Sequence, residues 1–285
     1  MSVPARLLRT AAVIAGLLIA QSSLFAQELT TRCDPPEGSL GQLTDAQKKA
    51  FLSSQDMFIA GRYADALADL RSLLAQLKSD TPAHLAMAER AAEAAIEAGD
   101  RAYAIALLKP IEEHEGSDCS ARTLLARAAA ENGESAERDA EINALAALHN
   151  QAPQSPAGKL DIFLLEKQRL PGGGRVAIWY ALRPFGPFHT HLLSEIQDAS
   201  GAELFRVELE SDDGDQVDFR ETYPELAAKG DRRYSLDIFA PDLTLSDGRI
   251  DHPHALIQFF DGAPTYDTVR DRILAIAKRS EKHSL

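Results

Sequence analysis

The chain has 285 residues and carries a formal net charge of −13 at pH 7. Its length accommodates two domains of ordinary size. The negative charge argues against nonspecific binding to nucleic acid and against docking on anionic lipid, and it is compatible with basic partners.

The first 26 residues have the pattern of a cleavable secretory signal peptide. Two arginines precede an apolar run over residues 11–20, which is shorter than the roughly 20 apolar residues of a membrane span. Polar residues interrupt this run, and Ala26 places a small residue at the expected cleavage site. We therefore expect a mature chain that begins at Gln27, contains no membrane span and is periplasmic or secreted from a bacterium. An uncleaved N-terminal anchor is the alternative.

The chain contains two cysteines, Cys33 and Cys119. Cys33 lies in an irregular, proline-containing leader over residues 27–43, and Cys119 lies in a turn between two predicted helices. Because an exported protein meets an oxidising compartment, an even number of cysteines favours pairing. Neither cysteine has a second cysteine or histidine at metal-ligand spacing. We therefore expect a disulfide between Cys33 and Cys119 that ties the leader to the helical region.

Residues 44–150 are rich in alanine and leucine and poor in β-branched residues, which favours helix. Thr44 and Gln47 form a capping-box pattern, and Thr81 followed by a proline is typical of another helix start. Three glycines each lie between two predicted helices of about 12–18 residues, at Gly61, Gly99 and Gly133. The predicted unit is therefore a helical hairpin, which occurs about three times.

The hairpins repeat along the chain. The segments that begin at Gly61, Gly99 and Gly133 align, and the last two of these glycines are 34 residues apart. This stretch resembles tetratricopeptide repeats (TPR), whose period is about 34 residues. The family's Trp and Pro positions are mostly absent, and an ordinary helical bundle is the alternative. At the positions where the family packs a small residue, this chain also has small residues, except that the third unit has Arg138. The matching residues are Ser54, Ala66, Ala92, Ala104 and Ala126.

The resemblance implies a stack of helical hairpins with a concave groove that binds a protein or peptide. In that family the first helix of each hairpin lines the groove, and here these helices begin near Thr44, Pro82 and Ser120. The solvent-facing residues of these helices that we expect to contact the partner are Gln55, Glu89, Glu93 and Arg127. Two of these four residues are negatively charged, which fits a basic or polar partner segment.

Residues 151–157 form a polar, proline-containing break that we interpret as a linker. In residues 158–285, apolar residues alternate in several short runs, which predicts strands. Turns are expected at residues 171–174 and 198–201. A helix is expected near the C-terminus, with an apolar stripe of Val269, Ile273 and Ile276. The predicted fold class is therefore α followed by α+β: TPR-like hairpins, then a mainly antiparallel sheet with a C-terminal helix.

No recognisable catalytic or cofactor motif is present. The sequence lacks an HExxH motif, a GxSxG elbow, a Walker loop and a Rossmann fingerprint, and we expect no cofactor. Two HxH patterns remain, one at His189 and His191 and the other at His252 and His254. Residues two apart on a strand point to the same face, so each pair could offer two imidazoles to one metal. Exposed polar residues at strand ends are the alternative interpretation.

We therefore expect a noncatalytic protein-interaction scaffold of the bacterial envelope that binds a protein or peptide through its TPR-like array. Two alternatives stay open. One is a metal-dependent hydrolase that uses the HxH pairs, and the other is a binder of envelope ligands with its site in the α+β domain.

Overall fold

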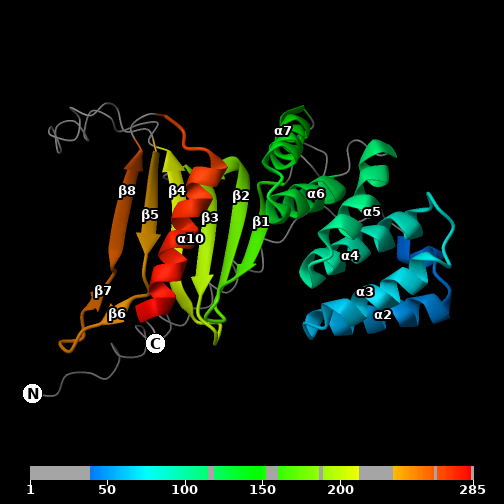
Figure 1. Cartoon of the computed structure of the whole chain (residues 1–285), viewed down its shortest axis with the longest axis horizontal. Coiled ribbons are helices and arrows are strands. Elements are labelled where there is room, and N and C mark those ends of the chain that lie inside the picture. The colour runs from blue at the N-terminus through cyan, green and yellow to red at the C-terminus, as the bar shows by residue number, and fades with distance from the viewer. Residues whose placement is uncertain are drawn as a thin grey trace, which may run out of the picture.

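The computed structural model describes residues 39–114, 119–151, 160–185, 189–211, 234–259 and 262–283. Residues 1–26, Cys33 and most of the predicted linker lie outside these ranges, so the signal peptide, the disulfide and the linker stay predictions. The described chain folds into a helical array, followed by an antiparallel sheet and a C-terminal helix (Figure 1). The predicted fold class is confirmed.

The helical array consists of successive helices that pair as hairpins in chain order. A short 3-10 helix, η1 (Ser39–Gln42), precedes them. The helices of the array are α2 (Asp45–Ile59), α3 (Tyr63–Leu74), α4 (Pro82–Ala98), α5 (Arg101–His114), α6 (Cys119–Asn132) and α7 (Ser135–Gln151).

Helix ends in the array follow the predicted capping signals. The hydroxyl of Thr44 accepts a hydrogen bond from the N–H of Gln47 at 3.3 Å, and the Gln47 side chain accepts one from the N–H of Thr44 at 2.9 Å. Thr81 caps α4 as an acceptor in the same way. The turn inside each hairpin contains a glycine with positive φ, a conformation that glycine adopts without steric cost; these are Gly61, Gly99 and Gly133.

Small residues lie buried inside the array. The aligned positions Ser54, Ala66, Ala92, Ala104 and Ala126 are all 0% exposed. Larger apolar side chains such as Leu70 and Leu108 fill the space around them. A small residue lets two helices approach closely, so these positions set the spacing of the stack. The predicted packing of helical hairpins is confirmed at this level.

The sheet has the strand order β1-β2-β3-β4-β5-β8, and each neighbouring pair is antiparallel. A separate two-stranded ladder, β6 (Leu243–Thr244) with β7 (Ile250–Asp251), precedes the last strand. The turns after β1 and β3 occur where they are predicted. The strands of the sheet are β1 (Ile162–Arg169), β2 (Arg175–Phe185), β3 (Thr190–Gln197), β4 (Glu203–Ser211), β5 (Tyr234–Phe239) and β8 (His254–Phe259).

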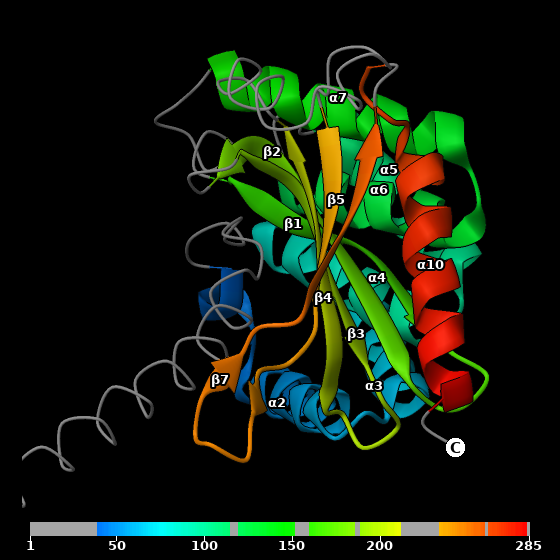
Figure 2. The ribbon, with the colours of Figure 1, turned by 90° about the vertical axis from the view of Figure 1, so that its left-hand side faces the viewer.

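Helix α10 (Tyr266–His283) lies along one face of the sheet (Figures 1 and 2). Val269 and Ile273 are 0% exposed and pack with strand residues that include Val176 and Leu236. Ile276 is partly buried against the same core. The predicted apolar stripe of this helix is therefore confirmed.

The array packs against the β1 edge of the sheet. Helix α6 lies beside β1, and a shared apolar core joins the two parts of the molecule (Figure 1). Ala126 and Leu145 of the array and Phe163 and Leu165 of β1 are all 0% exposed within this core. Because burial of apolar surface is favourable, this contact holds the array and the sheet together.

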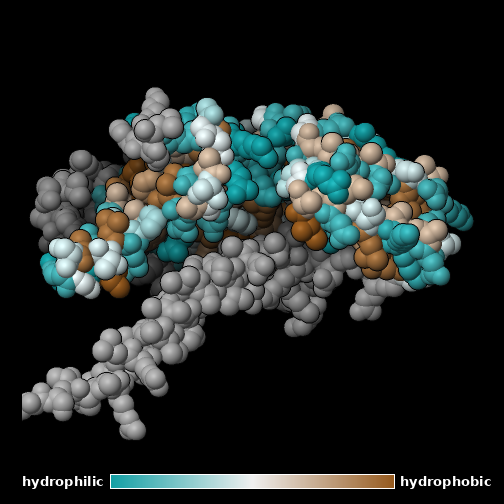
Figure 3. Space-filling view, turned by 90° about the horizontal axis from the view of Figure 1, so that it is seen from below, coloured by the Kyte–Doolittle hydropathy of each residue, from teal (hydrophilic) through white to brown (hydrophobic). Residues whose placement is uncertain are grey.

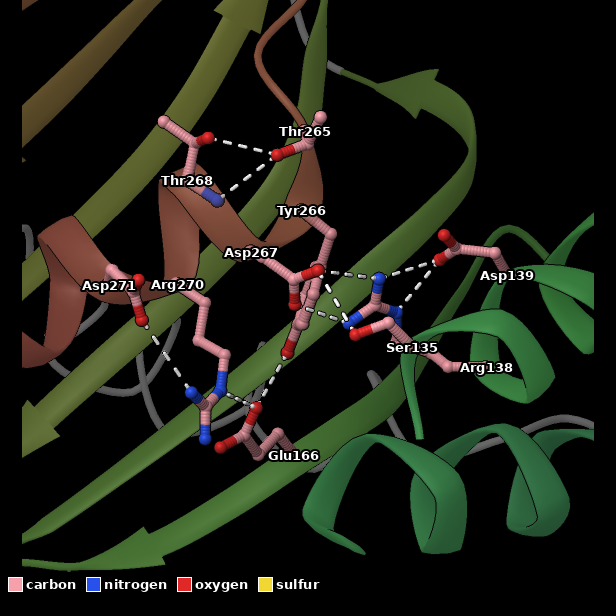
Figure 4. Close-up of polar contacts among 10 residues, drawn as sticks. All are labelled: Ser135, Arg138, Asp139, Glu166, Thr265, Tyr266, Asp267, Thr268, Arg270 and Asp271. Carbon is pink, nitrogen blue, oxygen red and sulfur yellow. Dashed lines mark hydrogen bonds and ion pairs between the residues drawn. The ribbon is translucent and has the colours of Figure 1, made fainter. Parts of the chain in front are cut away.

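A polar network reinforces that contact where α7 and α10 begin (Figure 4). Arg138 donates to Asp267 at 2.6 Å, and its guanidinium lies 4.4 Å from the ring centroid of Tyr266. The Tyr266 hydroxyl donates to Glu166 at 2.9 Å, and Arg270 donates to the same carboxylate at 2.6 Å. Charge-assisted hydrogen bonds thus connect α7, α10 and β1.

Exposed hydrophobic residues occur toward both ends of the molecule, with hydrophilic surface between them (Figure 3). In the part of the chain that the structure describes, no helix combines the length and the apolar character that a membrane crossing requires. The large exposed side chains are Leu40, Leu52 and Ile59 near the start of the array and Leu243, Leu245, Ile250 and Leu256 near β6, β7 and β8.

Candidate functional site

A cleft of about 490 Å³ opens where the array meets the sheet. One wall contains residues 96–101, at the turn between α4 and α5, and the C-terminal part of α6, while the other contains β1, β2 and β3. This volume lies within the range of roughly 300–1,000 Å³ that is usual for ligand sites. Basic residues outnumber acidic ones in its lining, which contains Arg101, Arg127, Lys167, Arg169 and Arg175 against Glu97, Glu131 and Glu195.

The pleat of β1 and β2 decides which side chains reach the cleft. Directly opposed residues of an antiparallel pair share one face of the sheet. Lys167 is opposed to Ala177, and Arg169 is opposed to Arg175. Glu166, which alternates with Lys167, instead contacts residues of α10. The two strands therefore present a row of basic side chains on the face opposite α10.

The floor of the cleft is a buried ion-pair network. Arg127, whose side chain is 5% exposed, donates to Glu97 at 2.8 Å and to Glu131 at 2.9 Å. Lys167 donates from Nζ to Glu97 at 2.6 Å, and Arg101 donates to Glu131 at 3.1 Å. Each glutamate is therefore shared by two cations, and the network joins α4, α5 and α6 to β1.

The network also sets the charge state of Glu97. Burial alone would raise the pKa of this carboxyl, but the nearby cations Arg127 and Lys167 outweigh burial and hold the pKa below its ordinary value. Glu97 therefore stays ionised at neutral pH. Its negative charge is neutralised by the two cations that it binds, and it does not cancel the other basic groups of the cleft.

Two arginines of the cleft stand outside this network. Arg169 ends β1 and Arg175 begins β2, and the two residues are directly opposed across the ladder. Both are exposed, and neither guanidinium forms a hydrogen bond or an ion pair with any residue in the described ranges. Directly opposed like charges destabilise an antiparallel pair. The folding of the hairpin therefore does not account for this pair of arginines.

Two aromatic side chains border the cleft, one from each part of the molecule. Tyr63 begins α3, and its ring packs edge-on against Phe58 with the centroids 5.1 Å apart. Burial raises the pKa of the Tyr63 hydroxyl; Glu97 acts in the same direction and Arg169 opposes it. Trp179, the single tryptophan of the chain, lies on β2 and is 8% exposed. Aromatic surface beside basic groups suits a ligand with both apolar and charged parts.

A second cavity of about 390 Å³ lies between α7, the start of α10 and the sheet. His191 lines it, with Nε2 at 2.8 Å from the hydroxyl of Ser211 and the ring centroid at 5.7 Å from that of Tyr234. Burial raises the pKa of Tyr180, another lining residue. Among the described residues that line this cavity, Asp139 is the one Asp, Glu, Lys or Arg, and His191 is the one histidine. The first cleft is the stronger candidate site because it collects charged groups from both parts of the molecule.

The predicted partner-binding residues are only partly where the sequence places them. The prediction that Glu89 and Arg127 face solvent is wrong, since they are 5% and 4% exposed. Neighbouring helices surround the alanine-rich α4, and the sheet covers part of α6, which a helical pattern alone does not reveal. Gln55 and Glu93 are partly exposed but do not line the cleft. Of these four residues, Arg127 alone lines it.

Sequence reasoning does not single out Lys167, Arg169 or Arg175. One signal is present, because the glycine-rich turn at residues 171–174 places Arg169 and Arg175 at the base of one hairpin. The opposite wall comes from residues about 70 positions earlier in the chain, as the contact of Lys167 with Glu97 illustrates with a separation of 70. No local sequence pattern predicts such a contact.

The two HxH pairs do not form the arrangement that the sequence suggests. His189 precedes β3 in a turn with a φ of 56°, so it does not share a strand face with His191. The Nδ1 atom of His252 lies 2.6 Å from Oδ1 of Asp242, whereas the ring of His254 stacks on the ring of Phe239. Strands β4 and β5 separate the strand of His191 from that of His254, a spacing of about 14 Å. The described residues contain no group of three or more His, Cys, Asp or Glu side chains that could hold a metal ion.

Comparison of the chain with protein-family models, curated proteins and solved structures finds no match.

Proposed function

We propose that this chain is an exported, noncatalytic binding protein of the bacterial envelope, and that it holds a segment of a protein or peptide partner in the cleft between its helical array and its sheet. The observation that carries the proposal is the pair Arg169 and Arg175, exposed in the cleft and neither hydrogen-bonded nor ion-paired to any described residue. Polar groups that converge in a concave site and stay unused by the fold are typical of binding sites.

The architecture supports a binding role. The hairpins resemble TPR units, a family that binds peptides or proteins, although the site proposed here lies at the turns of the hairpins and not in a concave groove. The signal-peptide pattern of residues 1–26 supports export to the periplasm or beyond. Export and localisation are part of the proposal.

The rigidity of the cleft also supports binding. The buried network of Glu97, Arg127 and Glu131 forms its floor, and the hydrogen bonds around Arg138 and Asp267 hold α7 against α10. Walls that are fixed before the partner arrives reduce the entropy lost on binding. A partner segment can therefore bind without a large rearrangement of the described chain.

Site-specific photo-crosslinking tests the proposal. A photoreactive amino acid is placed at Ala98 or Ala177, which line the cleft from opposite walls, and at Thr244, an exposed control residue of β6. After irradiation of the bacterium that produces the protein, we expect both cleft positions to capture the same partner segment, identified by mass spectrometry, and the control position not to capture it. Equal capture at Thr244, or none at the cleft, would contradict the proposal.

A further inference from the structure

We infer that the cleft recognises an acidic peptide segment, whose carboxylates bind to the opposed pair Arg169 and Arg175. This inference rests on the proposed function and specifies the chemistry of the partner. It reverses the expectation of a basic or polar partner, which rests on the acidic net charge of −13 and on the acidic helix residues Glu89 and Glu93, neither of which lines the cleft.

The distribution of charge in the cleft is the first argument. The acidic groups of the floor, Glu97 and Glu131, already bind Arg127, Lys167 and Arg101 at distances between 2.6 and 3.1 Å. The negative charges of Glu97 and Glu131 are therefore neutralised by ion pairs within the fold. Arg169 and Arg175 form no ion pair with a described residue, and the described lining contains one further acidic side chain, Glu195. With five basic and three acidic side chains, the lining is locally positive on an acidic protein.

The geometry of the arginine pair is the second argument. Side chains directly opposed in an antiparallel ladder have Cβ atoms about 4.5–5.5 Å apart, and Arg169 and Arg175 are opposed in this way. Each guanidinium is a planar fork of donors that matches a carboxylate in a bidentate contact. The guanidinium of Arg175 reaches toward Gly201 in the turn between β3 and β4, whereas Arg169 lies on β1. Two forks at separate places in one cleft favour a segment with several carboxylates over a single small anion.

The neighbouring residues complete the site. Tyr63 lines the array side of the same cleft as this pair. Trp179 and Ala177 continue the same face of β2 beyond Arg175. An acidic segment would therefore place its carboxylates on the arginines and its backbone or apolar side chains against Trp179.

The absence of an internal role for the pair is the third argument. Opposed like charges cost the folded state stability, and neutralising one of them removes this repulsion. Arg175→Gln should therefore raise the unfolding temperature of the unliganded protein by about 1–3 °C. If Arg175 served only to stabilise the fold, Arg175→Gln would instead lower the unfolding temperature.

Calorimetric titration of the full-length exported protein with hexaglutamate and with hexaglutamine tests the inference. We expect hexaglutamate to bind at least about tenfold more tightly than hexaglutamine, and binding to weaken as salt rises from 50 to 500 mM, roughly as screening demands. Arg169→Gln and Arg175→Gln should each weaken hexaglutamate binding about tenfold. The control Arg249→Gln, at an exposed arginine paired with Asp247 outside the cleft, should bind like the unchanged protein.

The possible failures are distinguishable. Equal binding of the two peptides, unaffected by Arg175→Gln, would overturn the acidic specificity while crosslinks from Ala98 and Ala177 would still uphold the cleft as the binding site. Displacement of hexaglutamate by an equal concentration of inorganic phosphate would also overturn it, because the site would then bind small anions without preference for a peptide. An unfolding temperature lowered by Arg175→Gln would assign the arginine to the fold and contradict the inference.

Discussion

Arg138 and Asp267 are 129 residues apart in the chain, yet they form two parallel hydrogen bonds, at 2.6 and 3.3 Å, between the first turns of α7 and α10. The guanidinium is buried, with 4% of the side chain exposed, whereas half of the Asp267 side chain remains exposed. Because α7 belongs to the array and α10 packs on the sheet, this pair helps to fix the two walls of the cleft relative to each other.

Asp267→Asn should lower the free energy of unfolding by about 1–2 kcal/mol, because it leaves a buried guanidinium with weaker acceptors. Chemical denaturation at pH 7 measures the loss. Asp65→Asn is the matched control, since Asp65 forms an exposed ion pair with Arg62 within α3 and its turn; there we expect less than about 0.5 kcal/mol. Equal losses in the two variants would show that the contact of Arg138 with Asp267 adds nothing to the junction.

Acid should weaken the buried floor of the cleft. The pKa of Glu97 is lowered in the folded protein, so ionised Glu97 stabilises the fold above its ordinary pKa of about 4.3, and this contribution is lost as the pH falls through the lowered value. Glu97→Gln should therefore cost about 1–3 kcal/mol at pH 7 and much less at pH 3. Urea unfolding of both proteins at each pH measures the difference.

Glu93→Gln is the control for that series. Glu93 forms an ion pair with Arg90 on the same helix and is more exposed than Glu97. We expect a loss of at most about 0.5 kcal/mol, with little dependence on pH. A loss for Glu97→Gln that is the same at pH 7 and pH 3 would contradict the assignment of an ionised Glu97 in the native state.

Local patterns in the sequence predict most of the fold and little of the site. The glycines of the hairpin turns and the apolar stripe of α10 are local signals, and both are confirmed. In strand β1 the alternation of apolar and polar residues is weak, because Glu166 and Lys167 place charged groups on opposite faces. The cleft depends on how β1 docks beside α6, a tertiary contact that no periodicity encodes.

The dependence on tertiary contacts also explains why the predicted solvent exposure of Arg127 and Glu89 is wrong. Arg127 and Glu89 look like surface residues because charged side chains are rarely fully buried unless they are paired. Arg127 is buried because Glu97 and Glu131 neutralise it from α4 and α6. The pair with Glu131 lies within α6, but the pair with Glu97 joins two helices across a separation of 30 residues, and the sequence alone does not reveal it.

Ala104→Leu should destabilise the array by about 1–3 kcal/mol, because Ala104 is 0% exposed at a helix crossing and a larger side chain overpacks it. The thermal unfolding midpoint and urea denaturation report the change. Ala68→Leu, on the exposed side of α3, is the control and should leave stability nearly unchanged. If both variants unfold like the unchanged protein, the crossing tolerates bulk and the packing assignment is wrong.

Cys33 and Cys119 should form a disulfide in the exported protein. The loop between them is long, so the chain-entropy model gives a stabilisation of up to about 4.5 kcal/mol. When the oxidised protein is unfolded in denaturant, a thiol-labelling reagent should modify neither cysteine until a reductant is added. Modification of both cysteines without reductant would disprove the pairing.

The central claim is that the cleft between the array and the sheet is the binding site, and Trp179 tests it most directly. It is the single tryptophan of the chain and lines the cleft, so the intrinsic fluorescence excited at the indole band reports on this site. Titration with hexaglutamate should change the emission of Trp179 saturably, with the same dissociation constant that calorimetry gives, and Arg175→Gln should weaken both equally. Saturable binding by calorimetry with unchanged Trp179 emission would place the ligand elsewhere and contradict the account.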